Sequence, residues 1–320
     1  RYDKNARTVI AHQSGEKFKV GSLEVSIWNV DHSVPGASAY IIKTLAGNIV
    51  YTGDLRLHGT HSHLTEQFIE QAAKAEPVVL IIEGTNIDEE KRASEAEVGE
   101  KALRVAHLAN QEKAALFAIF PARDTDRLNT FYQVARASER KLVISTKQAY
   151  LIDLLEGIPE YPSPSLEKGE VLVHLQRKWW PEFNEQGYDM WERVYFNHPH
   201  RITYHEIQKS PQDYLVYLDF YSIKELIDIN PPPGSHYIHS RSEPFSEDMN
   251  IDDELLNNWL ALFKLQRHQA HASGHASGPE LKEIIRAINP KKLLPVHTLH
   301  PEMFEGLAKE VLLVEEAKEY

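Results

Sequence analysis

The first part of the chain consists of short apolar segments separated by turn residues, which is the pattern of β-strands. Gly21 stands between the first two segments, and Ala46-Gly47 stands between the last two. The expected strands are KFKV (17–20), LEVSIWNV (23–30), AYIIKT (39–44) and NIVYTG (48–53). The sequence therefore predicts a β-rich layer before residue 55.

Helical and strand patterns alternate from Thr65 to about residue 157. Apolar residues at helical spacing predict helices at 66–75, 92–110, 126–137 and 147–157. Short apolar runs predict strands at 78–83, 115–120 and 141–145. These lengths are typical of α/β units that build a parallel sheet.

The sequence between 157 and 212 is rich in proline and aromatic residues, which predicts loops or an irregular surface segment. Regular segments follow at 213–218, 222–229 and 235–240, and DELLNNWLALF (253–263) predicts a helix. From His268 the pattern predicts a strand, a Ser-Gly loop and three further segments. These are a helix at 281–288, a strand at 292–297 and a helix at 301–310.

Composition narrows the classes of protein that the chain can belong to. With 320 residues, 42% of them hydrophobic, the chain is long enough for one large or two ordinary domains and is not disordered or fibrous. It contains no cysteine, so any metal must be held by His, Asp and Glu. No apolar run is long enough to span a bilayer, and no leader peptide is visible in the sequence, which begins Arg1-Tyr2-Asp3.

The formal net charge of −12 opposes non-specific attraction to nucleic acid or to an anionic membrane. A nucleic-acid partner would need a local basic groove, and ordinary solvated surface is the simpler interpretation of most cationic positions. The candidates for such a groove are Arg123, Arg127, Lys147, Arg177, Lys178 and Arg241.

Three polar residues follow predicted strands and are candidates for a metal site. His32 follows SIWNV, Asp54 closes NIVYTG, and His297 closes KLLPVH. Strand ends at one edge of a sheet converge, and imidazole and carboxylate are the ligands that zinc accepts without cysteine. Each residue alone is more simply a hydrogen-bonded group at the end of a strand.

The segment 271–280 (HASGHASGPE) carries a helix start. Ser277 and Glu280 have the spacing of a capping box, and Pro279 suits the first helical turn. His275 then precedes a helix N-terminus, where an anion such as phosphate is favoured, although a capped helix beside a surface histidine explains the segment equally well. Glu83, which ends VVLIIE, is either a solvent-facing strand end or a carboxylate that orients an imidazole.

Five ordered motifs together resemble one family, the metallo-β-lactamase-fold nucleases of the β-CASP group, which includes RNase J and the cleavage and polyadenylation nuclease. The resemblance covers the chain from about residue 17 to its end. The motifs are DHSVPGASAYII, IVYTGDLRLHG, IIEGTN, HASGHASGPELKEII and LLPVHT.

The resemblance implies an α/β protein in which a metallo-β-lactamase αβ/βα sandwich is interrupted by an inserted α/β β-CASP cap. The implied boundaries are 1–85 and 267–320 for the sandwich, with its N-terminal part missing, and 86–266 for the cap. An intact site of this kind holds two zinc ions on either side of a bridging aspartate and acts on RNA or DNA. A cytoplasmic location, no membrane association, and either a homodimer or a complementing N-terminal segment are expected with it.

The resemblance also implies roles for individual residues. His32, Asp54 and His297 would be metal ligands, and His275, Glu83 and Asp54 would be catalytic. In these roles Glu83 orients His275, which donates a proton to the leaving oxygen or holds the phosphate. The positions expected to bind a substrate phosphate are Ser273, Gly274 and Ser277.

The family's early motif, His-x-His-x-Asp-His, is absent from the sequence. The pairs His61-Ser62-His63 and His198-Pro199-His200, and His297 with His300, lack the Asp-His that should follow and come after His32. The expectation is therefore that the chain starts inside the nuclease domain and builds at most one weakened zinc site. A fragment of a longer protein, a protein split over two chains and a pseudo-enzyme would each explain this.

Three functions remain open at this stage. The first is a zinc-dependent phosphodiesterase of the β-CASP group that acts in RNA processing or decay. The second is a non-catalytic RNA-binding subunit or pseudo-enzyme. The third keeps the fold but changes the substrate to a small ester or thioester, since one fold hosts many activities.

Overall fold

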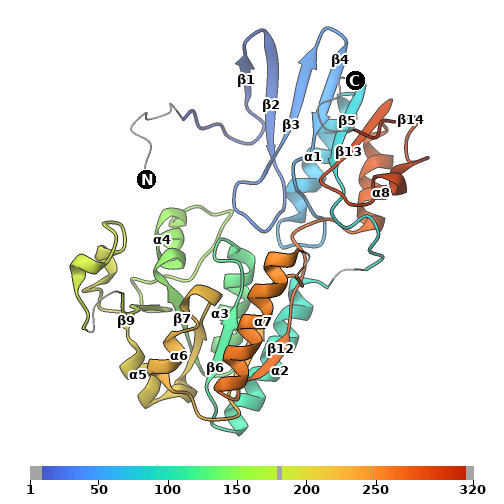
Figure 1. Ribbon diagram of the computed structural model, residues 1–320. Helices are drawn as coiled ribbons and strands as arrows, with labels where there is room; N and C mark the ends of the chain where they lie inside the picture. Colours follow the sequence, from blue (N-terminus) through green and yellow to red (C-terminus); the bar gives the residue numbers. More distant parts are fainter. Residues whose placement is uncertain (1–8, 92, 179–181, 245, 315–320) are drawn as a thin grey trace. The chain divides into compact units, whose positions relative to one another are not determined.

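The computed structural model describes residues 9–91, 93–178, 182–244 and 246–314, so the Arg1-Tyr2-Asp3 start and the Trp179-Trp180-Pro181 part of the predicted irregular stretch lie outside it. The described residues form two compact units (Figure 1). The first contains 9–32, 36–91 and 274–314, and the second contains 33–35 and the described residues of 93–273. The identification of these units with a metallo-β-lactamase domain and a β-CASP cap remains a prediction.

The first unit is built on a seven-stranded mixed sheet of order β1-β2-β3-β4-β5-β13-β14. Strands β1 to β4 form an antiparallel meander, whereas β4, β5, β13 and β14 run parallel to one another. Segments far apart in the sequence thus become neighbours, because β13 pairs with β5 over its whole length. The bounds are Lys17–Val20 (β1), Leu23–Asn29 (β2), Ser38–Thr44 (β3), Gly47–Tyr51 (β4), Val79–Glu83 (β5), Lys292–Val296 (β13) and Glu310–Val311 (β14).

One face of this sheet is covered by helices α1 (Ser62–Lys74) and α8 (Gly278–Ile288), which pack against each other. Phe68 of α1 and Leu281 of α8 are fully buried in the same core as Leu80 of β5. The helices place their apolar residues three and four positions apart, so that one stripe of each meets the sheet.

The opposite face of the sheet carries side chains that are only partly buried. In the strand register Ile27, Tyr40, Tyr51, Ile81 and Leu294 are successive neighbours across β2, β3, β4, β5 and β13. We call these five residues the apolar row. None of them is buried, and Tyr51 is 39% exposed. Within its described residues the first unit has one sheet, so the second sheet of the expected αβ/βα sandwich is not part of it.

The second unit is built on a seven-stranded sheet of order β12-β11-β6-β10-β7-β8-β9 in which every pairing is parallel. Buried apolar side chains fill its central strands β6, β10 and β7, as expected for a parallel sheet covered on both faces. The bounds are Leu116–Ile119 (β6), Lys141–Ser145 (β7), Leu172–His174 (β8), Arg201–Ile202 (β9), Tyr214–Tyr217 (β10), His236–His239 (β11) and Gln266–Gln269 (β12).

Helices pack on both faces of this second sheet. Leu116 and Ala118 point into a core shared with α2, α3 and α4, whereas Phe117 and Ile119 point into a core shared with α5, α6 and α7. The bounds are Glu95–Gln111 (α2), Thr125–Ala137 (α3), Thr146–Leu155 (α4), Tyr204–Lys209 (α5), Glu225–Ile229 (α6) and Glu247–Leu262 (α7). The second unit is therefore a doubly wound α/β layer.

Two expectations about local structure were wrong. The predicted helix at 301–310 is only a 3₁₀ turn, Pro301–Phe304, because Gly306 adopts a φ of +78° that turns the chain towards β14. The stretch from 157 to 212, expected to be irregular, contributes β8, β9 and α5 to the second unit. As expected, no helix in the described part of the chain is long and apolar enough to cross a membrane.

Candidate functional site

Three histidines and two carboxylates of the first unit gather beyond the ends of its strands. His32 follows β2, Asp54 follows β4, Glu83 is the last residue of β5, and His297 follows β13. His275 comes from the loop that precedes α8. The structure thus brings together five of the eight residues that the sequence proposed as metal-binding, catalytic or phosphate-binding.

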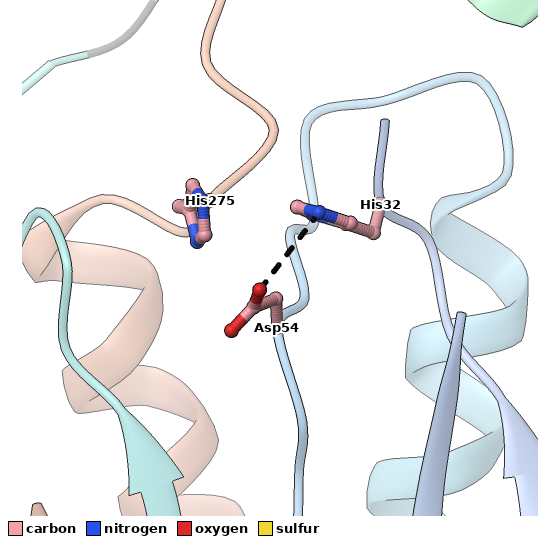
Figure 2. Close-up of side chains that lie close together, drawn as sticks. All are labelled: His32, Asp54 and His275. Carbon is pink, nitrogen blue, oxygen red and sulfur yellow. Dashed lines mark ion pairs between the residues drawn. The ribbon is translucent and has the colours of Figure 1, made fainter. Parts of the chain in front are cut away.

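Asp54 lies near two of the three imidazoles. Its Oδ2 is 4.0 Å from His32 Nε2, and its Oδ1 is 3.1 Å from His297 Nδ1. The His275 ring meets the His32 ring edge to face with centroids 5.0 Å apart, and it meets the His297 ring at 5.4 Å. Figure 2 shows that His32, Asp54 and His275 point towards a common space.

A hydrogen bond to the backbone of Gly274 fixes which ring nitrogen of neutral His32 carries the hydrogen. Its Nδ1 lies 2.6 Å from the carbonyl oxygen of Gly274, and because a carbonyl only accepts, Nδ1 carries the hydrogen. Burial lowers the pKa of His32, and this outweighs the opposing effect of the Gly274 carbonyl. The Nε2 atom that faces Asp54 therefore has a free lone pair at neutral pH.

Glu83 is a buried carboxylate that orients His275, so the alternative of a solvent-facing strand end is wrong. It is 1% exposed, and its Oε1 accepts a hydrogen bond from His275 Nδ1 at 3.2 Å. The backbone N–H groups of Thr85 and Leu55 donate to the two carboxylate oxygens at 3.0 and 3.3 Å. Burial alone would raise the pKa of Glu83, but the bonds from His275 and Thr85 lower it below the ordinary value. Glu83 is thus ionised at neutral pH.

His297 differs from the other two histidines in exposure and backbone conformation. Its side chain is 59% exposed, and its φ of +50° is in the left-handed region, which a non-glycine residue seldom adopts. The Thr85 hydroxyl donates to the His297 carbonyl at 3.3 Å and lies 3.4 Å from its Nδ1. Thr85 therefore contacts both His275 and His297, the former at 3.2 Å.

The position of Asp54 depends on the glycine before it. Gly53 has a φ of +56°, and a Cβ on this residue would lie 2.8 Å from the carbonyl oxygen of Ser38 in the neighbouring strand β3. Only glycine satisfies both the left-handed conformation and the close approach. The text Tyr51-Thr52-Gly53-Asp54 is thereby explained by local geometry.

A buried ion pair beneath the site was missed by the sequence reasoning. Arg56 Nε donates to Asp31 Oδ1 at 2.9 Å, and neither side chain is exposed. The other Asp31 oxygen accepts from the backbone of His61 at 3.0 Å. The pair joins the residue next to His32 to the loop that carries Asp54. The available signal was weak, because it consisted only of a charged residue close to each of two strand-end residues, Asp31 immediately before His32 and Arg56 two positions after Asp54.

Two groups of possible ligands occur among the described residues of this site. The ligand atoms of His32, Asp54 and His275 lie within 4.8 Å of one another, and so do those of Glu83, His275 and His297. The predicted trio of His32, Asp54 and His297 is not one of these groups, although Asp54 is close to each of its histidines.

The donor set fits a zinc ion. It consists of nitrogen and carboxylate oxygen, and His32 Nε2 presents a lone pair because its other nitrogen is bound to a carbonyl. With His275 as a ligand the group offers three protein ligands and an open position, as in a catalytic zinc site, whereas with His275 as a proton donor the protein ligands are His32 and Asp54. The residues present are sufficient for one such ion.

The three predicted phosphate-binding residues have different surroundings. The Ser277 N–H and hydroxyl both donate to Glu280, at 2.7 and 3.0 Å, in the predicted capping box of α8. The Gly274 carbonyl accepts from His32, and Ser273 belongs to the second unit. Glu280 is also 3.0 Å from His58 Nδ1, a contact that the sequence did not suggest. Phosphate binding at these positions remains a prediction.

Comparisons with known proteins indicate a metallo-hydrolase-like protein, and the fold and the donor set are consistent with this class. Residues 263–312 match the family described as "Zn-dependent metallo-hydrolase RNA specificity domain". A crystal structure of a protein of unknown function from Enterococcus faecalis superposes with a TM-score of 0.71 at 26% identity, over 98% of this chain and 67% of that one. The two-sheet α/β architecture is thus consistent with a metallo-β-lactamase-like fold plus a β-CASP-like domain.

The chain is also similar to curated proteins that are named ribonuclease J. Ribonuclease J of Sinorhizobium meliloti is 23% identical over 307 residues, which is 91% of this chain and 50% of that protein. Ribonuclease J of Thermus thermophilus is 25% identical over 92% of this chain and 49% of that protein. The chain is therefore a distant homologue of ribonuclease J, and it spans about half the length of the curated relatives it matches.

Proposed function

We propose that the protein is a zinc-dependent phosphodiesterase that cleaves RNA. The observation that carries the proposal is the convergence of His32, Asp54 and His275, with Glu83 buried behind His275. The distant homology to ribonuclease J and the match to an RNA-specificity domain support RNA as the substrate.

In this proposal each residue has a defined task. His32 and Asp54 hold the metal, which, when bound, supplies a water of lowered pKa for attack at phosphorus. Glu83 keeps the Nδ1 hydrogen of His275 directed towards itself and stabilises the positive charge when His275 gains a second proton. His275 then donates the proton on Nε2 to the leaving oxygen.

His297 has a separate place in the proposal. Its Nδ1 is 3.1 Å from Asp54 Oδ1, whereas His32 Nε2 lies near Asp54 Oδ2. Asp54 therefore offers one oxygen to each histidine. A second zinc ion would use His297 and this oxygen, with Asp54 between the two ions. The proposed domain assignment is a metallo-β-lactamase domain from 1–85 and 267–320 with a β-CASP cap from 86–266.

The test is cleavage of a 5′-labelled single-stranded RNA by the purified chain with zinc, with EDTA, and after zinc is restored. We expect EDTA to abolish cleavage, and we expect Asp54→Asn and His275→Ala to reduce the rate by at least about a hundredfold. His63→Ala is the matched control, because His63 is an exposed histidine of α1 and lies in neither ligand group. Cleavage that persists in both site variants would refute the proposal.

A second candidate is a non-catalytic RNA-binding subunit. The match of residues 263–312 to an RNA specificity domain supports it as well, because that match concerns RNA and not cleavage. It predicts tight RNA binding without cleavage at any zinc concentration. Parallel assays with single-stranded DNA and with a small thioester distinguish RNA cleavage from the other activities that this fold hosts.

A further inference from the structure

The second unit contains a cavity of about 340 Å³ at the carboxyl ends of its parallel strands. Ser145 ends β7, His174 ends β8, and Tyr217 ends β10, and all three line the cavity. The volume falls in the range of pockets that hold small ligands.

The topology of the sheet explains why a cavity forms here. Strands β10 and β7 are neighbours, yet the chain leaves them in opposite directions. After β7 it runs through α4 to β8, and after β10 it runs through α6 on the other face to β11. Such a reversal leaves a crevice outside the strand ends, which is where ligands bind in open α/β sheets.

The lining of the cavity is cationic, although the chain as a whole is acidic. Four cationic side chains face two anionic ones, namely Lys147, Arg177, Lys178 and Lys224 against Glu192 and Asp219. Glu192 is already bonded to Lys178 at 3.0 Å, and Asp219 accepts the Ser222 N–H at 2.9 Å in a local cap. Arg177 is also paired, with Asp228 at 2.6 Å, so Lys147 and Lys224 stand against Asp219 and supply the excess of positive charge for an anion.

A buried polar side chain lines the same cavity and lacks hydrogen-bond partners. His174 is 1% exposed, and among the described residues neither of its ring nitrogens is hydrogen-bonded. Glu225 Oε2, at 3.6 Å from His174 Nε2, is beyond hydrogen-bonding distance and has no partner either. Burial lowers the pKa of His174 to about 4, so its ring is neutral at pH 7 and offers one donor and one acceptor.

The rim of the cavity supplies an aromatic surface. Tyr221 follows β10, lines the cavity and is 82% exposed. An exposed aromatic ring beside cationic side chains is the combination on which nucleotide bases stack while their phosphates are neutralised.

We propose that this cavity binds a nucleoside phosphate, with the base against Tyr221, the phosphate near Lys147 and Lys224, and a polar group of the ligand on His174. The site belongs to the second unit alone and does not involve the histidine cluster of the first unit. Its occupant is either a free mononucleotide or one nucleotide of an RNA strand, since both present the same chemistry.

The test is equilibrium binding by calorimetry to the full chain, at constant salt and in EDTA so that no strand is cleaved. The probes are adenosine 5′-monophosphate, a 5′-phosphorylated hexa-adenylate, adenosine and inorganic phosphate. The variants are Tyr221→Ala and the double substitution Lys147→Glu, Lys224→Glu, and the matched control is Lys101→Glu on the exposed side of α2. The urea unfolding midpoint of each variant establishes that it is folded.

We expect at least one of the two nucleotide probes to bind more tightly than adenosine or phosphate, and we expect each pocket variant to weaken it by about tenfold. Lys101→Glu should leave the affinity unchanged. Binding of the mononucleotide identifies a free ligand, and binding of the hexa-adenylate alone identifies a nucleotide within RNA. Equal affinity in the wild-type chain and both pocket variants, or no preference over adenosine and phosphate, would overturn the proposal.

Because these measurements need neither zinc nor turnover, they are independent of the proposed RNA cleavage. Asp54→Asn should abolish cleavage and leave nucleotide binding unchanged, whereas Tyr221→Ala should weaken nucleotide binding. A chain that binds nucleotide but never cleaves RNA would support this site and refute the phosphodiesterase proposal.

Discussion

Two histidines of the site share one arrangement at the scale of the single residue. His32 donates from Nδ1 to the Gly274 carbonyl, and His275 donates from Nδ1 to Glu83. In each ring the Nδ1 hydrogen is committed within the protein, so Nε2 is the atom available for a metal or for proton transfer. The acceptors differ in charge, which suits a ligand role for His32 and a proton-transfer role for His275.

Replacement of Gly53 by alanine tests the local geometry that positions Asp54. The added Cβ would meet the Ser38 carbonyl at 2.8 Å in a left-handed backbone, so we expect the free energy of unfolding to fall by about 3 kcal/mol. Gly36→Ala is the control, because Gly36 has a φ of +78° but no atom within 4 Å of its Cβ position, and it should cost only about 1 kcal/mol. Urea unfolding that gives equal losses for the two variants would contradict the steric argument.

At the scale of the element, most helices and strands could be predicted from periodicity, because each has one face in a core. The capping box of α8 was also predictable, since Ser277 and Glu280 are local in sequence. The wrong predictions concern segments whose secondary structure is not determined by the local pattern of apolar residues. The helix pattern from Pro301 is broken by Gly306. The short strands β8 and β9 are fixed by pairing, β8 with β7 and β9 with β8, rather than by their own residues.

The candidate site was predictable to the same extent. The strand-end positions of His32, Asp54 and Glu83 followed from the pattern, as did the place of His275 before a helix. The contacts between them did not, because the distances depend on how β5 and β13 pair across more than 200 residues. The Asp31–Arg56 pair could not be foreseen, because nothing local marks two charges as partners in a core.

Glu280→Ala tests the start of α8. The carboxylate accepts from Ser277 and contacts His58, so its loss should cost about 1 kcal/mol of unfolding free energy at pH 7. Burial would raise the pKa of Glu280, but these bonds lower it below 4.5. The stabilisation is therefore complete above pH 4.5 and disappears as pH falls through the lowered pKa.

Urea titrations at pH 7 and about pH 3 measure this effect, and the difference between wild type and Glu280→Ala should shrink at the lower pH. Glu283→Ala, on the exposed side of the same helix, should change stability by less than about 0.5 kcal/mol at both values. A difference for Glu280→Ala that grows on acidification would show that the carboxylate is not the stabilising form.

At the scale of the whole molecule, the two units divide the chemistry of the chain. The first unit holds the histidine cluster, and the second holds a cationic cavity inside an acidic protein. Five of the six cationic residues proposed for a basic groove do not line this cavity as unpaired charges. Arg127 is buried against Glu95, and Arg123 and Arg241 lie outside the lining. Lys178 is paired with Glu192 and Arg177 with Asp228, which leaves Lys147.

Zinc should stabilise the intact chain against unfolding if the first unit holds it. Free zinc at about one hundred times its dissociation constant should add about 2.7 kcal/mol, because it binds the folded state and not the unfolded one. We expect His32→Ala to remove most of this increment and His63→Ala to retain it. Urea unfolding with and without zinc, with elemental analysis of the dialysed protein, measures both, and an equal increment in the two variants would place the ion elsewhere.

The apolar row gives the molecule a further property. Five partly exposed side chains, three aliphatic and two tyrosine, lie side by side on one sheet face of a chain whose net charge is −12. Contiguous partly exposed apolar side chains favour adsorption of a protein to apolar surfaces. The chain will collect at air–water boundaries and on apolar chromatography media, and more so at high salt, where repulsion between copies is screened.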